Sequence, residues 1–475
     1  MRSPEQALCH HERPSCQVVG PIPMAQDTIA AVATAPGCGA IGIVRVSGPG
    51  ARAVAMAITG RVPQARTATL ATFSNQHGEA IDQGMVIFFE APASYTSEDC
   101  LELQGHGGHV VLNQVLEAVL ACGVRLAQPG EFTKRAFRHG KLNLLQAEAV
   151  VDLIHASTPQ AALAASRSLR GVFADAVYGM AEMLAEIRST MEAAIDFAED
   201  MEAGMDIIGA VRPMLQALVA KLAGVLSQAR EGQAVAEGVQ VVLVGEPNAG
   251  KSSLFNRLSD EEAAIVTAMP GTTRDALLRQ ILLGGMLIHL TDTAGLASCP
   301  DPIEALGIEK TTMACRRADL LLAVASDDVP FGIQQELVQR LLQEQGIHTP
   351  VIWVRNKIDL TGSPATIEVR DGACLVYCSA LRGAGMDLLR QAITDQLLQG
   401  KSSPEPAFAA RRRHVEALTQ VKAFLEATDH FLVQGPLELA AEQLRQAQVA
   451  LGEIVGESSN EELLERIFSS FCIGK

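Results

Sequence analysis

The chain has 475 residues, too many for one hydrophobic core, and this length predicts about two to four domains. Hydrophobic residues make up 48% of the chain and aromatic residues only 4%, which favours a helix-rich protein. The formal net charge of −16 excludes a general nucleic-acid coat, because contact with phosphates requires clustered Lys and Arg. An RNA partner must therefore meet a local basic patch or be held by another subunit.

The first residues and the cysteines bear on where the protein works. Residues 1–26 contain prolines and no periodicity, so we expect a disordered extension there. The ten cysteines are scattered without paired zinc spacing, which favours reduced thiols and a cytoplasmic location. No apolar run reaches the length needed to cross a bilayer, so we expect no membrane span.

Periodicity divides the rest of the chain into four segments. Residues 27–140 are mixed, with strands expected at 41–46 and 85–89 and a helix at 110–121, which indicates an α+β domain. Residues 141–237 are helical throughout, and helical periodicity returns within 399–475 after a Ser/Pro-rich linker. Between them, residues 238–398 alternate strands and helices, which predicts an open, largely parallel sheet inserted into an all-α domain. The strands expected there are 239–244, 278–283, 287–291, 320–325, 351–354 and 374–378.

The stretch 245–252 matches the phosphate-binding pattern G-x-x-x-x-G-K-[ST] and lies between a predicted strand and a predicted helix. The glycines allow backbone N–H groups to surround a phosphate, and the helix N-terminus adds partial positive charge. Lys251 is expected to reach the β- and γ-phosphates, and the Ser252 hydroxyl is expected to bind Mg²⁺. The nucleotide-binding residues predicted in this loop are Asn248, Ala249, Gly250, Lys251, Ser252 and Ser253.

Three further motifs follow in the order used by a guanine-nucleotide switch. The first, within 267–275, contains Thr272 and Thr273, and the second is Asp292-Thr293-Ala294-Gly295 at the end of a strand. In the third, Asn356-Lys357-Ile358-Asp359, the Asp359 carboxylate can accept two N–H groups that guanine has and adenine lacks. Ser379-Ala380-Leu381 after the last strand can offer a backbone N–H to the guanine oxygen. We therefore predict a Ras-like P-loop GTPase domain.

One position departs from the Ras pattern. The residue after Gly295 is Leu296, where a Gln would orient the attacking water, and no nearby Arg is an obvious finger in cis. Hydrolysis therefore requires another group to orient water and another source of positive charge.

Nearly the whole chain, from about residue 27 to 475, resembles the tRNA-modification GTPase family MnmE (TrmE). The resemblance rests on short motifs along the chain, which are Leu101-Glu102-Leu103-Gln104-Gly105-His106-Gly107-Gly108, Pro129-Gly130-Glu131-Phe132, Gln146-Ala147-Glu148-Ala149, the loop containing Asn248, Gly271-Thr272-Thr273-Arg274-Asp275, Ala410-Arg411-Arg412-Arg413-His414 and Phe471-Cys472-Ile473-Gly474-Lys475. It implies a tetrahydrofolate-binding domain at 27–140, a helical domain from 141–237 and 399–475, and a GTPase domain at 238–398.

The resemblance also implies partners and a reaction. The family forms a homodimer through its N-terminal domains and works as a heterotetramer with MnmG, an FAD- and NADH-dependent subunit. Together they add an aminomethyl or carboxymethylaminomethyl group to C5 of the wobble uridine of certain tRNAs, with methylene-tetrahydrofolate as the carbon source.

The family's site residues carry over by position. K⁺ would be bound by Asn248, Thr267, Met269 and Thr272, Mg²⁺ by Ser252 and Thr273, and Glu304 would position the attacking water. The loop before the second motif adds Ala268, Pro270 and Gly271 to the GTP-binding set. Folate would be held by Arg45, Glu102, Lys141 and Lys475. The catalytic residues implied are Glu304, Lys251 and Cys472.

Plainer interpretations remain open for several of these residues. Glu304 could be a solvated loop glutamate, and Arg45 and Glu102 could form a surface ion pair. The basic run at 411–414, together with Lys134, Arg135 and Arg138, could contact tRNA or could be a solvated face. A regulatory GTPase switch without modification chemistry, or a folate-dependent methyltransferase acting alone, would share parts of the pattern.

Overall fold

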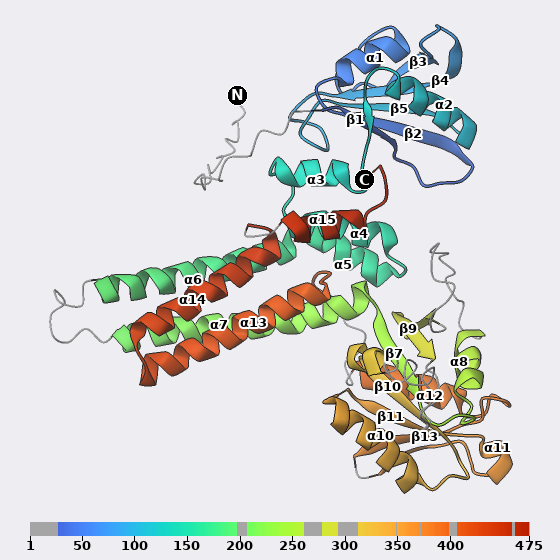
Figure 1. The fold of residues 1–475 in the computed structure, drawn as a ribbon, viewed down its shortest axis with the longest axis vertical. Helices are drawn as coiled ribbons and strands as arrows, with labels where there is room; N and C mark the ends of the chain where they lie inside the picture. Colours follow the sequence, from blue (N-terminus) through green and yellow to red (C-terminus); the bar gives the residue numbers. More distant parts are fainter. Residues whose placement is uncertain are drawn as a thin grey trace, which may run out of the picture. The chain divides into compact units, whose positions relative to one another are not determined.

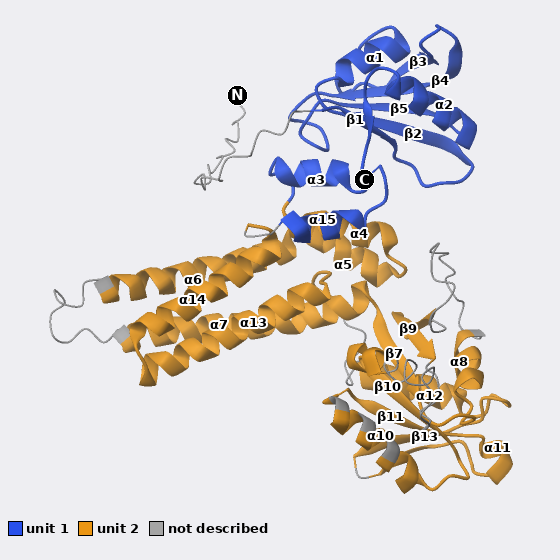
Figure 2. Cartoon of the chain, viewed as in Figure 1, with its two compact units in different colours: residues 1–142, 461–475 blue, residues 143–460 orange. Residues whose placement is uncertain are grey.

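The structure, a computed structural model, describes residues 27–196, 207–260, 278–292, 312–347, 349–370, 372–398, 406–457 and 461–474. The chain divides into two compact units, coloured separately in Figure 2. The first contains Met1–Leu142 and Glu461–Lys475, and the second contains Asn143–Asn460.

The first unit is built on a six-stranded sheet with the order β3-β4-β5-β2-β1-β6. The strands are β1 (Ile29–Val32), β2 (Gly39–Ser47), β3 (Thr69–Ser74), β4 (Ala80–Phe89), β5 (Cys100–Gly107) and β6 (Arg125–Leu126). Alternation along β2 and β5 places Val44, Val46, Leu101 and Leu103 on one face, where α1 (Ala51–Thr59) and α2 (His109–Leu120) cover them. The opposite face of the same strands therefore carries the polar residues of the site described below.

The C-terminal helix belongs to this first unit. In α15 (Glu461–Ser469), Phe468 contacts Phe137 of α3 (Glu131–Arg138), with ring centroids 6.2 Å apart. After α15 the tail reaches β1, and Gly474 has a φ of +97° there. A Cβ at this position would lie 2.2 Å from the Val32 carbonyl oxygen, so the close approach requires glycine. The structure thus groups residues 461–474 with the N-terminal unit, whereas the sequence-based division placed them at the end of the helical domain.

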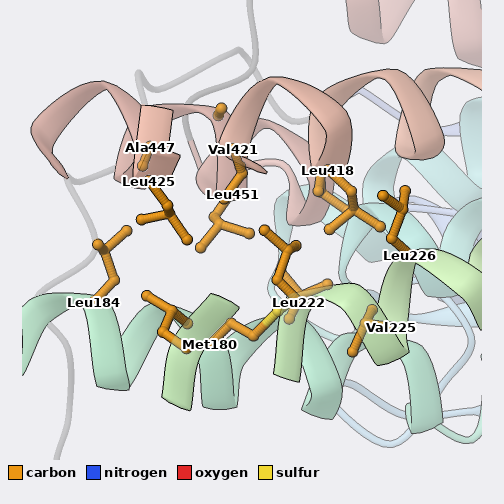
Figure 3. Packing of buried hydrophobic residues seen from close by; sticks show 14 of the residues in the cluster. Met180, Leu184, Leu222, Val225, Leu226, Leu418, Val421, Leu425, Ala447 and Leu451 are labelled. Carbon is orange, nitrogen blue, oxygen red and sulfur yellow. The ribbon is translucent and has the colours of Figure 1, made fainter. Parts of the chain in front are cut away.

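The helical part of the second unit is made from two separate stretches of sequence, as the periodicity predicts. Four long helices share one hydrophobic core, part of which is shown in Figure 3, with Leu222, Leu418 and Leu451 among its buried side chains. They are α6 (Val172–Asp196), α7 (Ile207–Ala236), α13 (Arg412–Gln434) and α14 (Leu437–Val455), and two shorter helices, α4 (Leu144–His155) and α5 (Pro159–Leu169), precede them. Apolar side chains three or four residues apart form the stripe that each long helix buries.

Within the described ranges, one helix meets the length and composition of a membrane span. Residues Ile208–Ala236 of α7 have a mean hydropathy of 1.3 in their most apolar window. Leu215, Leu218 and Leu222 of the same helix are buried in the core shared with α6, α13 and α14. The apolar face of α7 is therefore accounted for by helix packing.

The remainder of the second unit is a seven-stranded sheet with the order β12-β13-β11-β10-β7-β9-β8. The strands are β7 (Val239–Val244), β8 (Leu278–Leu283), β9 (Met286–Asp292), β10 (Leu320–Ser326), β11 (Val351–Asn356), β12 (Ile367–Arg370) and β13 (Ala373–Tyr377). The inner strands are parallel, and the edge strands β8 and β12 run antiparallel to their neighbours. The helices with both ends in the described part are α8 (Lys251–Asp260), α10 (Phe331–Gln345), α11 (Ile358–Thr361) and α12 (Met386–Leu398), and residues 312–317 are helical too.

This α/β part lies between α7 and α13 in the chain, as Figure 1 shows by colour. The six strands expected from sequence are all present, and β12 is an additional edge strand. Parallel sheets of this kind bind ligands at the carboxyl ends of their strands.

Candidate functional site

The Gly-rich loop connects β7 to α8 at the carboxyl edge of the seven-stranded sheet. The Lys251 ammonium donates to the carbonyl oxygens of Gly245 at 3.1 Å and Glu246 at 2.9 Å. Gly250 has a φ of +92°, and a Cβ there would lie 2.2 Å from Nδ2 of Asn356. Glycine is therefore required where this loop passes the motif that follows β11.

Oxygen atoms suited to a divalent cation lie beside this loop. The Ser252 hydroxyl donates to Oδ2 of Asp292 at 2.7 Å. Among the described residues, Oδ1 of Asp292 is buried and has no hydrogen-bond partner. Hydroxyl and carboxylate oxygens are the ligands that Mg²⁺ prefers, directly or through its water shell, so the donor set fits this metal. Burial lowers the pKa of Lys251, while the Asp292 carboxylate opposes that shift.

The base-recognition motif is tied to the phosphate loop. Nδ2 of Asn356 donates to the Ala249 carbonyl oxygen at 3.1 Å, and Nζ of Lys357 donates to the Asn248 carbonyl oxygen at 2.7 Å. Lys357 and Asn248 adopt left-handed backbone conformations, with φ of 65° and 64°. Because non-glycine residues seldom adopt this conformation, the two positions mark a constrained site.

The last loop of the sheet completes the same site. The buried Ser379 hydroxyl donates to Oδ1 of Asp359 at 2.5 Å, and the Ala380 N–H donates to Oδ1 of Asn356 at 3.0 Å. The Ser379 hydrogen bond is the first cause of a lowered pKa at Asp359. Asp359 is thus held as an acceptor, the form that recognition of guanine N–H groups requires. Leu381, next in this loop, is exposed.

Several predicted site residues cannot be placed. Those outside the described residues are Thr267, Ala268, Met269, Pro270, Gly271, Thr272, Thr273, Thr293, Ala294, Gly295, Glu304 and Lys475. The structure brings together the remaining nucleotide-site residues, with Ser253 exposed on the first turn of α8.

A second site lies in the first unit, on the polar face of its sheet. A cavity of about 240 Å³ is lined by Arg45, Arg66, Phe89, Ala93, Ser94, Tyr95, Cys100, Glu102 and Lys141. Arg45 donates to Oε1 of Glu102 from Nε at 3.1 Å and from Nη2 at 2.9 Å. Its guanidinium carbon lies 5.5 Å from the centre of the Tyr95 ring and 5.8 Å from that of Phe132. Arg45, Glu102 and Lys141, predicted from separate motifs, therefore line one cavity.

Ser94 is the residue of this cavity that sequence reasoning missed most clearly. Its side chain is buried, and its hydroxyl has no hydrogen-bond partner among the described residues. Its carbonyl oxygen accepts a hydrogen bond from Nζ of Lys141. A buried hydroxyl without a partner is costly unless a ligand or water satisfies it. Because Ser94 lies in an irregular loop, no periodicity in the sequence could have indicated it.

The C-terminal tail approaches the strands that carry this cavity. The Gly130 N–H donates to the Cys472 carbonyl oxygen at 3.4 Å, and the Cys472 residue is exposed. Gly474 contacts Val32, and the preceding residue, Ala31, pairs with Arg45 across β1 and β2.

The basic run after residue 410 is largely an internal ion-pair network. Arg413 donates to both oxygens of the buried Glu148 at 2.8 and 2.6 Å, and His414 contacts Glu148 at 2.9 Å. Arg411 donates to Oδ1 of Asp152 at 2.6 Å, which leaves Arg412 as the exposed member of the run. The prediction of a tRNA-binding run is therefore not supported, because helix packing uses three of its four side chains.

The other basic cluster considered for tRNA is also paired. Lys134 and Arg138 contact Glu461 at 3.0 and 2.6 Å, and Arg135 contacts Asp27 at 2.6 Å. Ion pairing within the first unit therefore accounts for these charges.

The phosphate loop, the Ser252–Asp292 pair and the Asn-Lys-x-Asp turn on a mostly parallel sheet define a P-loop GTPase. Two family profiles match the chain: "MnmE helical domain" over residues 144–472 and "GTP-binding protein TrmE N-terminus" over residues 28–141. A tRNA modification GTPase MnmE of Nitrosococcus oceani is 47% identical over 94% of this chain and 97% of the relative. The corresponding protein of Nitrosomonas europaea is 45% identical over 94% of this chain and 99% of the relative. The chain belongs to the MnmE (TrmE) family of tRNA modification GTPases.

Two properties follow from membership of this family. The chain is a GTP hydrolase, and it takes part in tRNA modification. Among solved structures, the G domain of the FeoB iron transporter of T. maritima is similar at 26% identity, with a TM-score of 0.27. That likeness covers 34% of this chain and 98% of the FeoB chain.

Proposed function

We propose that the chain is a K⁺-activated GTPase that modifies C5 of the wobble uridine in certain tRNAs together with the FAD-dependent subunit MnmG. In this proposal it is cytoplasmic, forms a homodimer through its N-terminal unit and assembles with MnmG into a heterotetramer. The observation that carries the proposal is the cavity of the first unit, which Arg45, Glu102 and Lys141 line together with Ser94, whose hydroxyl has no partner within the described ranges.

The cavity suits the head group of a tetrahydrofolate. Its volume of about 240 Å³ lies below the roughly 300–1,000 Å³ of sites for whole drug-sized ligands, so a bicyclic ring would enter and a glutamate tail would extend outward. Glu102 can accept N–H groups of a pterin edge, and Ser94 can donate to or accept from a ring nitrogen or oxygen. Arg45 and Lys141 offer cationic donors for ligand oxygens or carboxylates. Bound methylene-tetrahydrofolate would supply the one-carbon unit.

Titration of the whole protein with 5-formyltetrahydrofolate tests this assignment. Arg45→Ala removes a charged donor and should weaken binding roughly tenfold or more, while Ser94→Ala removes a neutral hydrogen bond and should weaken it several-fold. Arg52→Ala is the matched control, because Arg52 is an exposed arginine of α1 outside the cavity.

Undiminished binding by Arg45→Ala would contradict the folate assignment. No binding by the wild-type chain would instead favour the regulatory GTPase switch, which needs no folate. A folate-dependent methyltransferase acting alone has less support, because the basic clusters that it would need for RNA are engaged in internal ion pairs.

The proposal also includes two cations at the GTP site, Mg²⁺ and K⁺. Ser252 and Thr273 would bind Mg²⁺, and Asp292 would hold its water shell, consistent with its buried Oδ1, which has no partner in the described part of the chain. Asn248, Thr267, Met269 and Thr272 would bind K⁺ with oxygen ligands. K⁺ would supply the positive charge that an arginine finger provides in other GTPases. Glu304 would orient the attacking water in place of the missing Gln.

Asn248 is the proposed K⁺ ligand that the structure describes. Its backbone carbonyl is bound to Lys357, which holds the residue at its left-handed φ of 64°. Because the proposed ligand atom is the side-chain oxygen, Asn248→Ala should lose most of the K⁺ stimulation of GTP turnover while GTP binding is retained. Equal turnover in K⁺ and Na⁺ by the wild-type protein would contradict the cation's role.

Cys472 remains a candidate catalytic residue in this proposal. It is exposed on the C-terminal tail of the first unit, close in sequence to Gly474 at β1. In this proposal Cys472 acts at the folate site. The titration with 5-formyltetrahydrofolate tests that site and does not involve the thiol.

A further inference from the structure

A buried arginine lies directly before the base-recognition motif. The Arg355 side chain, at the carboxyl end of strand β11, is 6% exposed. Its Nη1 donates to Oε1 of Gln334 at 3.2 Å, and its Nη2 donates to the carbonyl oxygens of Asp327, at 2.9 Å, and Val329. Nε lies 3.5 Å from Oδ1 of Asp327. The guanidinium is thus directed into the loop between β10 and α10.

Asp327 joins this loop to both sides of the base-recognition motif. Its N–H donates to the Asn356 carbonyl oxygen at 2.7 Å. Its Oδ2 accepts hydrogen bonds from the hydroxyls of Thr361 and Ser363, each at 2.6 Å. Asp327, whose side chain is 7% exposed, therefore contacts both the start of the motif and the turn that follows it.

The segment between these contacts has little structure of its own. Helix α11 has 4 residues, begins after Lys357 at a φ of 65° and ends at Gly362 with a φ of 78°. A helix this short is not stable by itself, and the left-handed backbone of Lys357, a non-glycine residue, requires support from its surroundings. Asp359 lies in the middle of this segment.

We propose that Arg355 and Asp327 act as positioning residues for guanine recognition, because they hold the turn that carries Asp359. The inference rests on the proposed contact between Asp359 and guanine. Gln334 extends the support: it is buried and donates from Nε2 to the Ala323 carbonyl oxygen of β10 at 2.6 Å. The guanidinium thereby fixes the base-recognition turn relative to two neighbouring strands of the sheet.

A buried ion pair can also serve ordinary stability, and base selectivity separates the two roles. Guanine presents a ring N–H and an exocyclic amine to Asp359, whereas hypoxanthine lacks the amine. A displaced Asp359 should therefore cost GDP more affinity than IDP. General destabilisation of the domain would reduce both affinities alike.

The experiment measures dissociation constants of GDP and IDP for the full-length wild-type protein and four variants. Arg355→Met removes the guanidinium, and the double variant Thr361→Val/Ser363→Ala removes the hydroxyl donors without disturbing the buried arginine. GDP affinity should fall roughly tenfold in Arg355→Met, the loss expected for a hydrogen bond to a charged group, with a several-fold fall in the GDP-to-IDP preference. Arg340→Met, at an exposed arginine paired within α10, should match the wild-type protein.

A wild-type GDP-to-IDP preference in both the folded Arg355→Met protein and the double variant would overturn the inference. If Arg355→Met does not fold, the double variant alone decides. Asp359→Asn is measured in parallel and should lose the preference for guanine. If it keeps that preference, the proposed guanine contact fails and the inference fails with it. If Asp359→Asn loses the preference and the other variants keep it, the positioning role alone is wrong.

Discussion

At the scale of single residues, His414 shows how packing sets a protonation state. Its Nδ1 accepts the Arg411 backbone N–H at 2.9 Å, so the proton of the neutral ring lies on Nε2, which donates to Glu148. Burial, together with the nearby Arg413 and Arg411 charges, lowers the pKa of His414 to about 4, although Glu148 opposes this shift. Burial opposes the charge of Glu148, but the cationic neighbours and hydrogen bonds hold its pKa below its usual range.

Acid should therefore destabilise the helical part of the second unit. The unfolded chain protonates His414 below a pH of about 6.5, whereas the folded chain resists until a pH of about 4. Protonation in this window favours the unfolded state, so the free energy of unfolding should fall by about 3 kcal/mol as the pH drops through it. Helical unfolding followed by circular dichroism between pH 7.5 and 4.5 measures the effect.

The control for this prediction is another histidine of the same helix. His414→Gln should be less stable at pH 7.5 but should show a smaller loss with acid. His430→Gln, at an exposed position of α13, should keep the wild-type slope. The same acid slope in His414→Gln as in the wild-type chain would show that other groups cause it.

Residues of the two candidate sites differ in how far the sequence could predict them. Lys251, Ser252 and Asp359 lie at short fixed spacings, because the phosphate loop and the base-recognition turn are local structures. Ser94 and Asp327 take their roles from contacts with residues distant in the chain. Their parts in the candidate sites therefore follow from the fold and not from any local pattern.

At the scale of elements, the insertion of the α/β part depends on a tight return of the chain into the helical bundle. Phe408 stacks on Phe173 of α6 with ring centroids 4.2 Å apart. A Cβ at position 232 of α7 would lie 2.1 Å from the Phe408 carbonyl oxygen, so glycine is required where the returning segment crosses α7. The Ser168 hydroxyl and the Ala409 backbone exchange hydrogen bonds of 3.0 and 2.9 Å on the other side. These contacts fix the point at which the helical domain resumes.

The elements that sequence patterns predict best are those with a strong period or a continuous apolar run. Strand β7 is buried on both faces of a parallel sheet, so its sequence is almost wholly apolar. Edge strand β12, with the sequence Ile-Glu-Val-Arg, is short and mostly exposed and offers no such signal. Helix α15 has the expected periodicity, but periodicity cannot indicate which unit a helix packs against.

At the scale of the whole molecule, two candidate sites must serve one reaction. The GTP site lies in the second unit and the proposed folate site in the first. Binding of GTP and cations can order the loops around the γ-phosphate, and hydrolysis can release them, which is how GTPase switches act on their surroundings. In our proposal, this cycle drives the modification chemistry that the folate pocket and the MnmG subunit supply.

The central claim is that GTP hydrolysis by this chain is required for modification of the wobble uridine. Mass analysis of tRNA nucleosides from a strain lacking the gene tests it, after complementation with the wild-type chain, Lys251→Ala, Glu304→Ala or the control Arg52→Ala. The C5 group should disappear on deletion, return with the wild-type chain and Arg52→Ala, and stay largely absent with Lys251→Ala and Glu304→Ala. Unchanged wobble uridine in the deletion strain, or full restoration by Lys251→Ala, would contradict the account.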